Sequence, residues 1–160
     1  MPIDKVSREQ VRIDRVSREH FPVWKRMREA LYSGLDPEFH DGEMEWIESS
    51  GEAECYLAFD EKGKPIGMME LSLRNVVDGC IGGPVGYVEG IYLEPEHRRG
   101  GLGSELMQFA TERFRARGCS DMATDAEIEN VEAQEFYRQV GFTESWRVVG
   151  FTRSLREQGH

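Results

Sequence analysis

The chain has 160 residues, 39% of them hydrophobic, which is enough apolar content for one folded domain with a buried core. Its formal net charge of −10 argues against nucleic acid as a partner, because the phosphates would be repelled. The same charge would suit a cationic substrate, although a soluble acidic protein without such a substrate would carry it equally well. No apolar run is long enough to span a membrane, so we expect no membrane partner.

The cysteines and the first residues indicate a compartment. Cys55, Cys80 and Cys119 are odd in number and lack metal-like spacing, which is typical of free thiols in a reducing cytoplasm. Residues 1–10 are rich in charge and contain no apolar stretch, so we expect no secretory signal there. The four histidines also lack metal-ligand spacing, and we expect no metal.

A short repeat opens the chain, since Ile3–Glu9 recurs in similar form as Ile13–Glu19. Two copies are too few for a solenoid. We therefore expect residues 1–10 to be an extension outside the fold, and residues 11–157 to form one domain.

In the first half of the domain, the sequence pattern predicts three strands and two helices. Residues 11–16 alternate apolar and polar, which predicts the first strand. Ser17 is a suitable N-cap for a helix that reaches about Ser33, and a weaker helical pattern covers residues 41–50. Strands are expected at 55–59 and 65–74, joined by a hairpin turn that contains a glycine.

The second half predicts a crossover. After a glycine-containing loop, residues 85–93 form a strongly β-prone run, and an apolar face beginning at Leu102 predicts a helix that ends at Gly118. The remaining expected elements are a strand at 121–125, a helix at 132–140, and strands at 143–149 and 151–155. This order predicts a mixed α/β fold with an antiparallel start and a βαβ crossover.

The most specific motif is Arg98-Arg99-Gly100-Gly101-Leu102-Gly103, which follows a predicted strand and opens a predicted helix. Glycines let a ligand approach the backbone closely, and the first N–H groups of a helix have no internal partners. With the helix macrodipole, these groups would bind a pyrophosphate. A flexible glycine loop is the alternative for this motif taken alone. Neither a P-loop nor a Rossmann site fits, because the flanking sequence differs from both.

Two motifs together resemble the GNAT N-acetyltransferases. The run Leu93-Glu94-Pro95 with Arg98-x-x-Gly101-x-Gly103 is similar to the family's acyl-coenzyme-A signature. A second segment of the family is matched by Asn130, Ala133, Phe136-Tyr137 and Gly141-Phe142. The resemblance implies the GNAT fold, a single twisted mixed β-sheet flanked by helices on both faces, with acetyl-CoA as cosubstrate. It implies cofactor contacts from Ile91, Tyr92, Leu93, Arg98, Arg99, Gly100, Gly101, Leu102, Gly103, Ser104, Asn130 and Tyr137.

For Tyr137 the resemblance implies a second role, in which its hydroxyl protonates the departing coenzyme-A thiolate as general acid. Core packing on an amphipathic helix is the alternative for this aromatic pair, and we adopt it for Phe136.

Beyond these motifs, the chain from about Val11 to Leu155 is similar to one branch of the family, the aminoglycoside 6′-N-acetyltransferases. The carriers are Asp41-Gly42-Glu43, Asn75–Cys80, Val88-Glu89-Gly90-Ile91-Tyr92 and Met122-Ala123-Thr124-Asp125. The resemblance implies transfer of an acetyl group to the 6′-amine of these antibiotics, which confers resistance. The branch often has an aromatic near Val76 and an acidic residue near Trp146, and this chain departs from both patterns.

The candidate catalytic carboxylates are Glu89 and Asp125. In the family arrangement the two strands that carry them splay apart around the acetyl group, and family members use carboxylates at these positions to hold the 6′-amine. An amine must lose a proton before it attacks a thioester, and a nearby carboxylate can accept that proton. We favour Asp125 as the base and Glu89 as the orienting group. The alternatives are a solvent-facing strand residue for Glu89 and a strand-end cap for Asp125.

Tyr32 lies where this branch has an aromatic in the substrate wall, and an aromatic face suits a sugar ring and a cation. The alternative for Tyr32 is packing against the core at the end of a helix. We interpret Trp24 as a core residue. His97 is interpreted as a loop residue and not a base.

The implied mechanism is direct transfer in a ternary complex, with backbone amides at a strand bulge near Ile91 stabilising the oxyanion. Two alternatives stay open: an acetyltransferase for another cationic amine, such as a polyamine or a protein N-terminus, and a non-catalytic acyl-CoA-binding module. A homodimer is expected, because the family often pairs through C-terminal strands and residues 143–155 offer such an edge.

Overall fold

The computed structural model describes residues 10–157, which form two compact units that divide after Asp125. The first unit holds the sheet and three of the α-helices, and the second holds the last helix and the segment after it. The expected extension at residues 1–10 lies outside the described residues, except for Gln10. The backbone N–H of Gln10 donates to Glu61 Oε1 at 3.2 Å.

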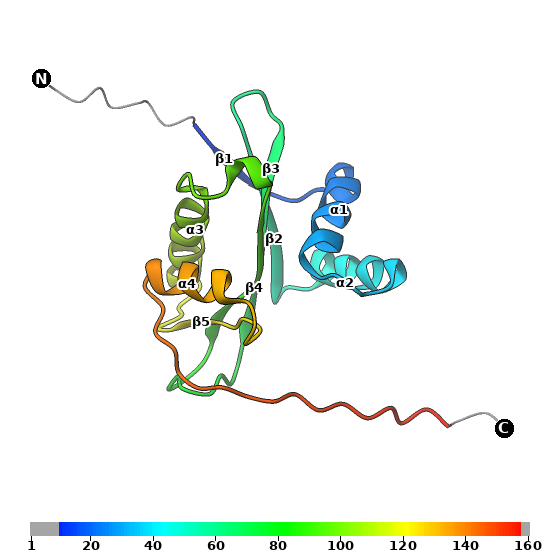
Figure 1. Ribbon diagram of the computed structural model, residues 1–160, viewed down its shortest axis with the longest axis vertical. Helices are drawn as coiled ribbons and strands as arrows, with labels where there is room; N and C mark the ends of the chain where they lie inside the picture. Colours follow the sequence, from blue (N-terminus) through cyan, green and yellow to red (C-terminus); the bar gives the residue numbers. More distant parts are fainter. Residues whose placement is uncertain (1–9, 158–160) are drawn as a thin grey trace, which may run out of the picture. The chain divides into compact units, whose positions relative to one another are not determined.

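The first unit is built on a five-stranded mixed sheet in the order β1-β2-β3-β4-β5 (Figure 1). Its strands are β1 Arg12–Arg15, β2 Ala53–Phe59, β3 Pro65–Arg74, β4 Val85–Leu93 and β5 Met122–Thr124. Neighbouring strands are antiparallel up to β4, and β4 pairs with β5 in parallel. The predicted mixed α/β order is confirmed, because the crossover between β4 and β5 carries a helix as a parallel pair requires.

Helices cover both faces of this sheet, as predicted (Figure 1). One face carries α1 Phe21–Leu31 and α2 Pro37–Ser49, with the short 3₁₀ helix Arg18–His20 leading into α1. The other face carries α3 Leu102–Ala116. α2 begins earlier than its expected start, because Pro37 fits the first turn of a helix, where no N–H is needed.

Strand alternation explains the two cores. Cys55, Leu57 and Phe59 of β2 pack with Trp24 and Met27 of α1 in one buried cluster. The residues between them point to α3, where the rings of Tyr56 and Phe109 lie 4.7 Å apart. Because successive strand residues face opposite sides, a strand covered on both faces is buried throughout, as β2 is.

Glu54 is a buried carboxylate on the α3 side of the sheet. It accepts hydrogen bonds from Arg113 Nη2 at 2.9 Å and from Arg117 Nη1 at 2.7 Å, and the Tyr56 hydroxyl also donates to it. Burial opposes its ionisation, but the hydrogen bonds from Arg113 and Tyr56 and the nearby positive charges outweigh burial and hold the pKa of Glu54 below its usual value. This cluster ties α3 to the sheet.

β4 contains a bulge, and Glu89 is its extra residue. Glu70 of β3 pairs with Gly90 and Leu71 pairs with Val88, so Glu89 has no partner across the ladder. A Cβ atom added to Gly86 would meet the ring of Phe114 on α3, whereas one added to Gly90 would lie 2.0 Å from the Tyr32 hydroxyl beside α1. In a regular strand Gly86 and Gly90, four residues apart, would face the same side of the sheet. They face opposite sides because the extra residue at the bulge reverses the alternation.

The second unit contains α4 Val131–Gln139, close to its predicted bounds. The expected strands at 143–149 and 151–155 are wrong for the described chain, because residues 143–157 form neither helix nor strand. Val148, Phe151 and Leu155 are exposed there. An apolar run has the propensity for a strand but becomes one only when a neighbouring strand accepts its backbone hydrogen bonds. No helix within residues 10–157 combines the length and apolar character needed to cross a bilayer.

Candidate active site

The glycine turn between β4 and α3 forms a helix N-terminus without a side-chain cap. The short 3₁₀ helix Pro95–His97 leads into it, and Gly101 is the N-cap of α3 with φ of 92°. This left-handed conformation favours glycine. Because glycine has no side chain to cap the helix, the N–H groups that follow are left for a ligand.

The positions around this N-cap suit an anion. Arg99, with φ of 66°, and Gly100 are exposed, and a Cβ atom added to Gly100 would meet nothing within 4 Å. Arg98 Nε donates to the carbonyl oxygen of Leu93 at 3.0 Å, which ties the turn to the end of β4. The turn therefore combines open space, unpaired helix N–H groups and positive charge, and the pyrophosphate of acetyl-CoA would fit it.

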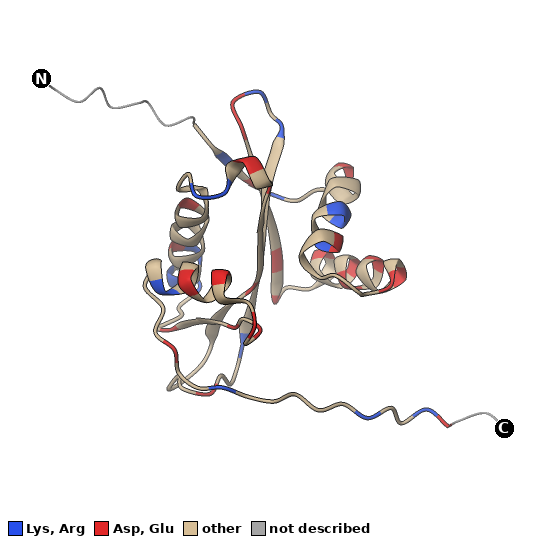
Figure 2. Ribbon diagram, viewed as in Figure 1, with Lys and Arg blue, Asp and Glu red and all other residues tan. Residues whose placement is uncertain are grey.

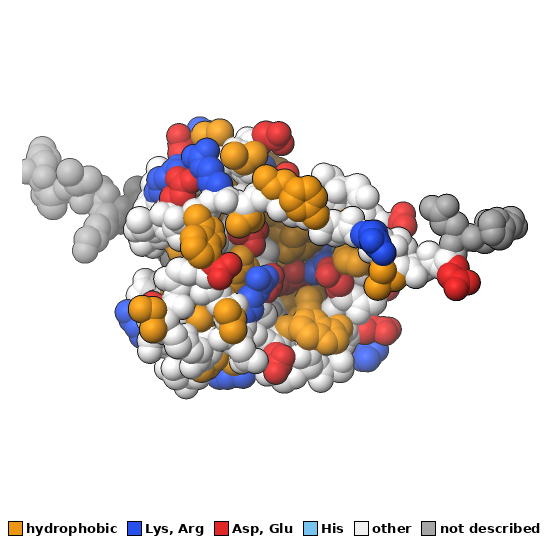
Figure 3. Space-filling model, turned by 90° about the horizontal axis from the view of Figure 1, so that it is seen from below, with side chains coloured by type: hydrophobic (Ala, Val, Ile, Leu, Met, Phe, Trp, Pro, Cys, Tyr) orange, Lys and Arg blue, Asp and Glu red, His pale blue; other side chains and the backbone are white. Residues whose placement is uncertain are grey.

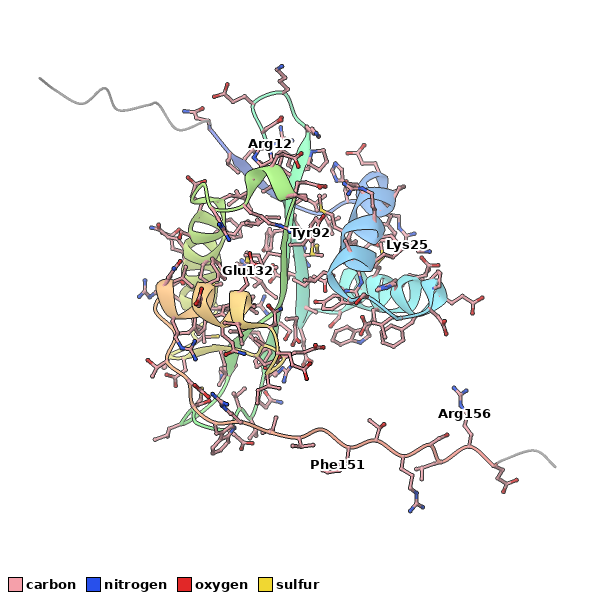
Figure 4. The ribbon with its side chains drawn as sticks, viewed as in Figure 1. Arg12, Lys25, Tyr92, Glu132, Phe151 and Arg156 are labelled. Carbon is pink, nitrogen blue, oxygen red and sulfur yellow. The ribbon has the colours of Figure 1, made fainter. Side chains whose placement is uncertain are left out.

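The outer edge of β4 becomes free halfway along the strand. Its pairing with β5 covers only Gly86–Val88 against Met122–Thr124. Beyond that point, Ile91–Leu93 pair with β3 alone among the described strands. Tyr92 is half-buried and packs against the core on the α1 side, as its labelled side chain on β4 indicates (Figure 4). Backbone groups on the free edge can accept an extended ligand such as a pantetheine arm.

Glu89 and Asp125 directly follow the last residue pair that joins β4 to β5. Val88 pairs with Thr124, and the Thr124 hydroxyl donates to the Val88 carbonyl oxygen at 2.9 Å. Both carboxylates are exposed, although Val88 and Gly90 on either side of Glu89 are buried. The structure thus brings the two predicted carboxylates to one place, the point where β4 and β5 part.

Each carboxylate has a hydrogen-bond partner. Glu89 accepts from the Ser72 hydroxyl at 2.5 Å and from Arg74, and Asp125 accepts from the hydroxyl of Tyr87. Burial and this hydrogen bond to Asp125 raise the pKa of Tyr87, so the phenol remains a donor across the physiological range.

A cleft of about 550 Å³ opens beside Glu89. Its charged lining comprises three glutamates and two arginines: Glu43, Glu70, Glu89, Arg28 and Arg74. Ser72 and a set of aromatic and apolar side chains complete it: Tyr32, Leu35, Phe39, Trp46, Ile47, Ala53, Leu71 and Leu73. The space-filling view from below shows apolar and charged side chains gathered around a hollow (Figure 3).

The floor of the cleft is a buried ion pair. Arg28 Nη1 donates to Glu70 Oε1 at 2.6 Å, both side chains are almost fully buried, and Trp24 Nε1 donates to Glu70 Oε2 at 2.8 Å. Arg28 also contacts Glu43. Because both charges are buried and paired, we assign this pair to holding α1 against β3.

Tyr32 links this floor to the bulge. Its hydroxyl lies 3.2 Å from Glu70 Oε1 and 3.2 Å from the backbone oxygen of Glu89, to either of which it can donate. Burial and the Glu70 charge raise its pKa, which keeps the hydroxyl protonated. Tyr32 is half-buried and lines the cleft, so it combines the two interpretations of the sequence, a wall residue and a helix-end packing residue.

The remaining predicted residues, Asn130 and Tyr137, belong to the second unit. Asn130 Oδ1 accepts from the backbone N–H of Ala133 at 3.1 Å and so caps α4. Tyr137 is half-buried, with its ring 5.4 Å from that of Phe136 and 5.7 Å from that of Phe142. The Tyr137 ring therefore packs between those of Phe136 and Phe142 within the second unit.

Comparison with known proteins decides the family. The sequence matches the acetyltransferase (GNAT) family over residues 19–142. The chain belongs to the GNAT acetyltransferases. It is 33% identical over 128 residues to an aminoglycoside N(6′)-acetyltransferase type 1 from Serratia marcescens, covering 79% of this chain and 88% of that protein.

Solved structures of similar proteins agree with this GNAT assignment. The apo crystal structure of the aminoglycoside antibiotic 6′-N-acetyltransferase AAC(6′)-IG from Acinetobacter haemolyticus has a TM-score of 0.84 and 32% identity, covering 91% of this chain and 99% of that one. AAC(6′)-Iy in complex with the bisubstrate analogue CoA-S-monomethyl-acetylneamine also has a TM-score of 0.84, at 27% identity, covering 91% and 99%. The fold predicted from the sequence is thereby confirmed.

Several cleft residues of this GNAT chain escaped the sequence analysis. Phe39 and Trp46 are exposed aromatics on α2. Their spacing of seven residues, about two helical turns, indicates that they share one face of the helix. Glu70, Ser72 and Arg74 are two residues apart along β3, so strand periodicity places all three on one face. No sequence pattern indicates that Arg74 reaches Glu89, because this contact depends on the register between β3 and β4. Among residues 10–157, no three His, Cys, Asp or Glu side chains form a metal-ligand group.

Proposed function

We propose that the protein transfers the acetyl group of acetyl-CoA to the 6′-amine of aminoglycoside antibiotics. Several relatives similar over most of their length are named for this activity, and one structural neighbour is a complex with a CoA–acetylneamine bisubstrate analogue. The observation that carries the proposal is the position of Glu89 and Asp125 where β4 parts from β5, at the edge of an acidic cleft lined with aromatics.

The cleft has the chemistry that a polycationic sugar requires. Its lining carries one more glutamate than arginine, and α2 beside it has five acidic residues and neither lysine nor arginine (Figure 2). Negative potential of this kind concentrates cations near a site. The exposed rings of Phe39 and Trp46 offer flat apolar surfaces to sugar rings.

We assign acetyl-CoA to the free edge of β4 and the glycine turn, with Ile91–Leu93 for the pantetheine arm and Arg98–Ser104 for the pyrophosphate. The open space at Gly100 and the uncapped N-terminus at Gly101 support this assignment. The match of Asn130 and Tyr137 to the family's second motif supports adding them as contacts to the cofactor arm.

The reaction follows from these positions. Asp125 accepts a proton from the 6′-ammonium while Glu89 orients it, and the amine nitrogen attacks the thioester carbonyl carbon. Backbone N–H groups of β4 after the bulge stabilise the resulting oxyanion. The tetrahedral intermediate loses the surplus proton of its nitrogen to solvent and collapses with cleavage of the C–S bond, and the thiolate takes the proton of the Tyr137 hydroxyl. Asp125 then releases its proton to solvent and Tyr137 takes one back, so one proton is released per turnover. The products are the acetamide and free coenzyme A.

We further propose that the enzyme is a cytoplasmic homodimer. Acetyl-CoA is a cytoplasmic metabolite, and the alternating apolar residues of 143–155 would form a dimer edge if a partner supplied the neighbouring strand. Light scattering after gel filtration tests the dimer, and a mass near the chain's own 18.4 kDa would contradict it.

The test of function is a thiol-release assay with acetyl-CoA and a panel of acceptors. The panel comprises a 6′-amino aminoglycoside, its 6′-hydroxyl counterpart, spermidine and a peptide with a free N-terminus. We expect rapid turnover of the 6′-amino compound alone, with the acetyl group located on that nitrogen by NMR.

Each other result identifies an alternative. Equal acetylation of the 6′-hydroxyl compound would mean that another amine of the aminoglycoside is the target. Preference for spermidine or the peptide would assign the protein to another class of amine. Acetyl-CoA binding by calorimetry without turnover of any acceptor would leave a non-catalytic acyl-CoA-binding module.

A further inference from the structure

Arg74 is a cation inside the cleft that the proposed reaction does not use. It is the last residue of β3, and its side chain is 43% exposed. Its Nη2 atom lies 2.9 Å from Glu89 Oε2 and 3.0 Å from Oε1, and its Nε lies 3.1 Å from Oε1. Two N–H groups of one planar guanidinium thus bind a single carboxylate, which is the stronger arrangement for such a pair.

This contact engages both oxygens of Glu89, with three donors at Oε1 and Arg74 Nη2 at Oε2. The Ser72 hydroxyl donates to Glu89 Oε1, the same oxygen that receives Arg74 Nε. An incoming ammonium group therefore finds Glu89 already paired with a cation and already hydrogen-bonded. It must displace the guanidinium to reach the carboxylate.

The same guanidinium is also linked to Asp125, by way of the Tyr87 side chain. Arg74 Cζ lies 3.5 Å from the centroid of the Tyr87 ring, and the hydroxyl of that ring donates to Asp125. A cation over an aromatic face is attracted by the ring. Arg74 therefore contacts Glu89 directly and lies against the tyrosine that donates to Asp125. Its charge lies next to the place where an acceptor's ammonium would bind.

We propose that Arg74 is a specificity-determining residue, an internal cation that occupies Glu89 until a polycationic acceptor displaces it, and that simple monoamines are thereby excluded. This proposal rests on the proposed function. A monoamine exchanges one cation for another at Glu89 and gains little. A polycation makes the same exchange, but its further ammonium groups can reach the acidic side chains of α2. Asp41, Glu43 and Glu48 there already pair with basic side chains of α1 and of the 3₁₀ helix before it, whereas no ion pair within residues 10–157 involves Glu38 or Glu45.

The position of Arg74 makes this testable, because its side chain is not part of the core. It is exposed at the end of a strand, and ion pairs of partly exposed side chains contribute little to folding. Arg74→Met keeps the length of the stem and removes the charge. Arg74→Lys keeps the charge and loses the planar fork.

A matched control lies at the opposite end of the first unit. Arg12 on β1 also pairs with a carboxylate, Asp14, at 2.6 Å and also lies over an aromatic ring, that of Phe59, at 4.6 Å. It does not line the cleft (Figure 4). Arg12→Met therefore removes the same kind of interaction without touching Glu89.

The experiment measures binding of two acceptors to the full-length protein by calorimetry, together with KM and kcat where turnover occurs. One acceptor is a 6′-amino aminoglycoside and the other is methyl 6-amino-6-deoxyglucoside, which carries a single ammonium. We expect Arg74→Met to bind both acceptors about tenfold more tightly, because each has to exchange a cation at Glu89 in the wild type. The monoamine has no further ammonium group to offset that exchange, so it should bind measurably only in this variant. Arg74→Lys and Arg12→Met should keep the wild-type affinities for both acceptors, and thermal unfolding should be unchanged in all three.

Unchanged or weaker binding of either acceptor in Arg74→Met, or wild-type protein that binds the monoamine as tightly as the aminoglycoside, would overturn the proposal and leave Arg74 as a residue that only positions Glu89. This outcome is distinct from failure of the proposed function. If the wild-type protein does not acetylate the 6′-amino compound, that function fails, while the calorimetric comparison still decides the role of Arg74.

Discussion

The glycine turn at the start of α3 and the carboxylate cleft beside β4 are built in different ways. In the turn, the proposed binding groups are backbone N–H groups, and the sequence contributes mainly by omitting side chains at Gly100 and Gly101. In the cleft, the proposed binding groups are side chains from β3, β4, α1 and α2, and polar ones such as Glu89 and Tyr32 are hydrogen-bonded to other side chains. The proposed cofactor half is therefore local in sequence, while the proposed acceptor half is assembled from distant segments.

This difference has a consequence for specificity. A backbone site depends on chain geometry and can stay the same while most surrounding residues change. A side-chain site changes its preference with single substitutions, because each contact is a particular charge or ring. We therefore expect variation in acceptor choice among similar proteins to arise in the cleft, with the turn unaltered.

The largest expected effect lies beside the cleft, at the point where β4 and β5 part. Asp125→Asn removes the proposed base while keeping size and hydrogen-bonding shape, so kcat should fall by about 10²–10⁴-fold with acetyl-CoA affinity intact. Glu89→Gln should instead raise the KM of the acceptor, if that residue only orients the amine. Steady-state kinetics across pH measure both. Full turnover in Asp125→Asn would transfer the base role to Glu89 or to water.

In the turn, Gly100→Glu should weaken acetyl-CoA binding by about 100-fold, because a carboxylate would meet the pyrophosphate. The backbone at Gly100 is not in the left-handed region and its Cβ position is open, so the fold should tolerate the change. Gly51→Glu is the matched control, since Gly51 is also exposed with nothing within 4 Å of its Cβ position. Calorimetry with acetyl-CoA that finds equal affinity in both variants would remove the pyrophosphate from this turn.

A smaller effect is expected where the cleft meets the bulge. Tyr32→Phe removes the hydroxyl that serves Glu70 and the backbone of Glu89. We expect kcat/KM to fall about tenfold, equivalent to about 1.4 kcal/mol and similar to the loss of one hydrogen bond. Acetyl-CoA affinity measured by calorimetry should not change. If it weakens as much as kcat/KM does, the two halves of the site are coupled through β4.

The smallest effect on activity is expected for a carboxylate on the opposite face of the sheet. Glu54→Gln should leave kcat unchanged and lower the free energy of unfolding by about 1–3 kcal/mol, because the hydrogen bonds from Arg113 and Arg117 lose a charged acceptor. Urea unfolding at neutral pH measures this loss.

The pH dependence of this cluster has a definite sign. The pKa of Glu54 is lower in the folded protein than in the unfolded chain, so its contribution is present above the unfolded pKa and is lost as pH falls through the folded pKa. Wild type should therefore lose more stability than Glu54→Gln on acidification below about pH 4.3, the usual pKa of a glutamate. Parallel pH profiles for the two proteins would contradict the assignment.

The sequence predicts the local features of this protein better than its distant contacts. Strand bounds at 65–74 and 85–93 agree with the structure because hydrophobic pattern and turn residues both mark them. Residues 143–157 fail for the opposite reason, since strand propensity there has no partner among the described strands. Arg74 and Glu89 are fifteen residues apart in the sequence, and their pairing depends on the register between β3 and β4, which no local pattern determines.

The bulge at Glu89 also sets how the chain can vary in length. Before it, Gly86 faces α3, and after it, Gly90 faces α1, so the single extra residue keeps both halves of β4 in phase with their own cores. Deleting Glu89 would shift the register of Ile91–Leu93 by one residue. Each of these side chains would then face the opposite side of the sheet. Loop residues 75–84 carry no such constraint. Insertions and deletions in similar proteins should therefore accumulate in that loop and be absent from β4.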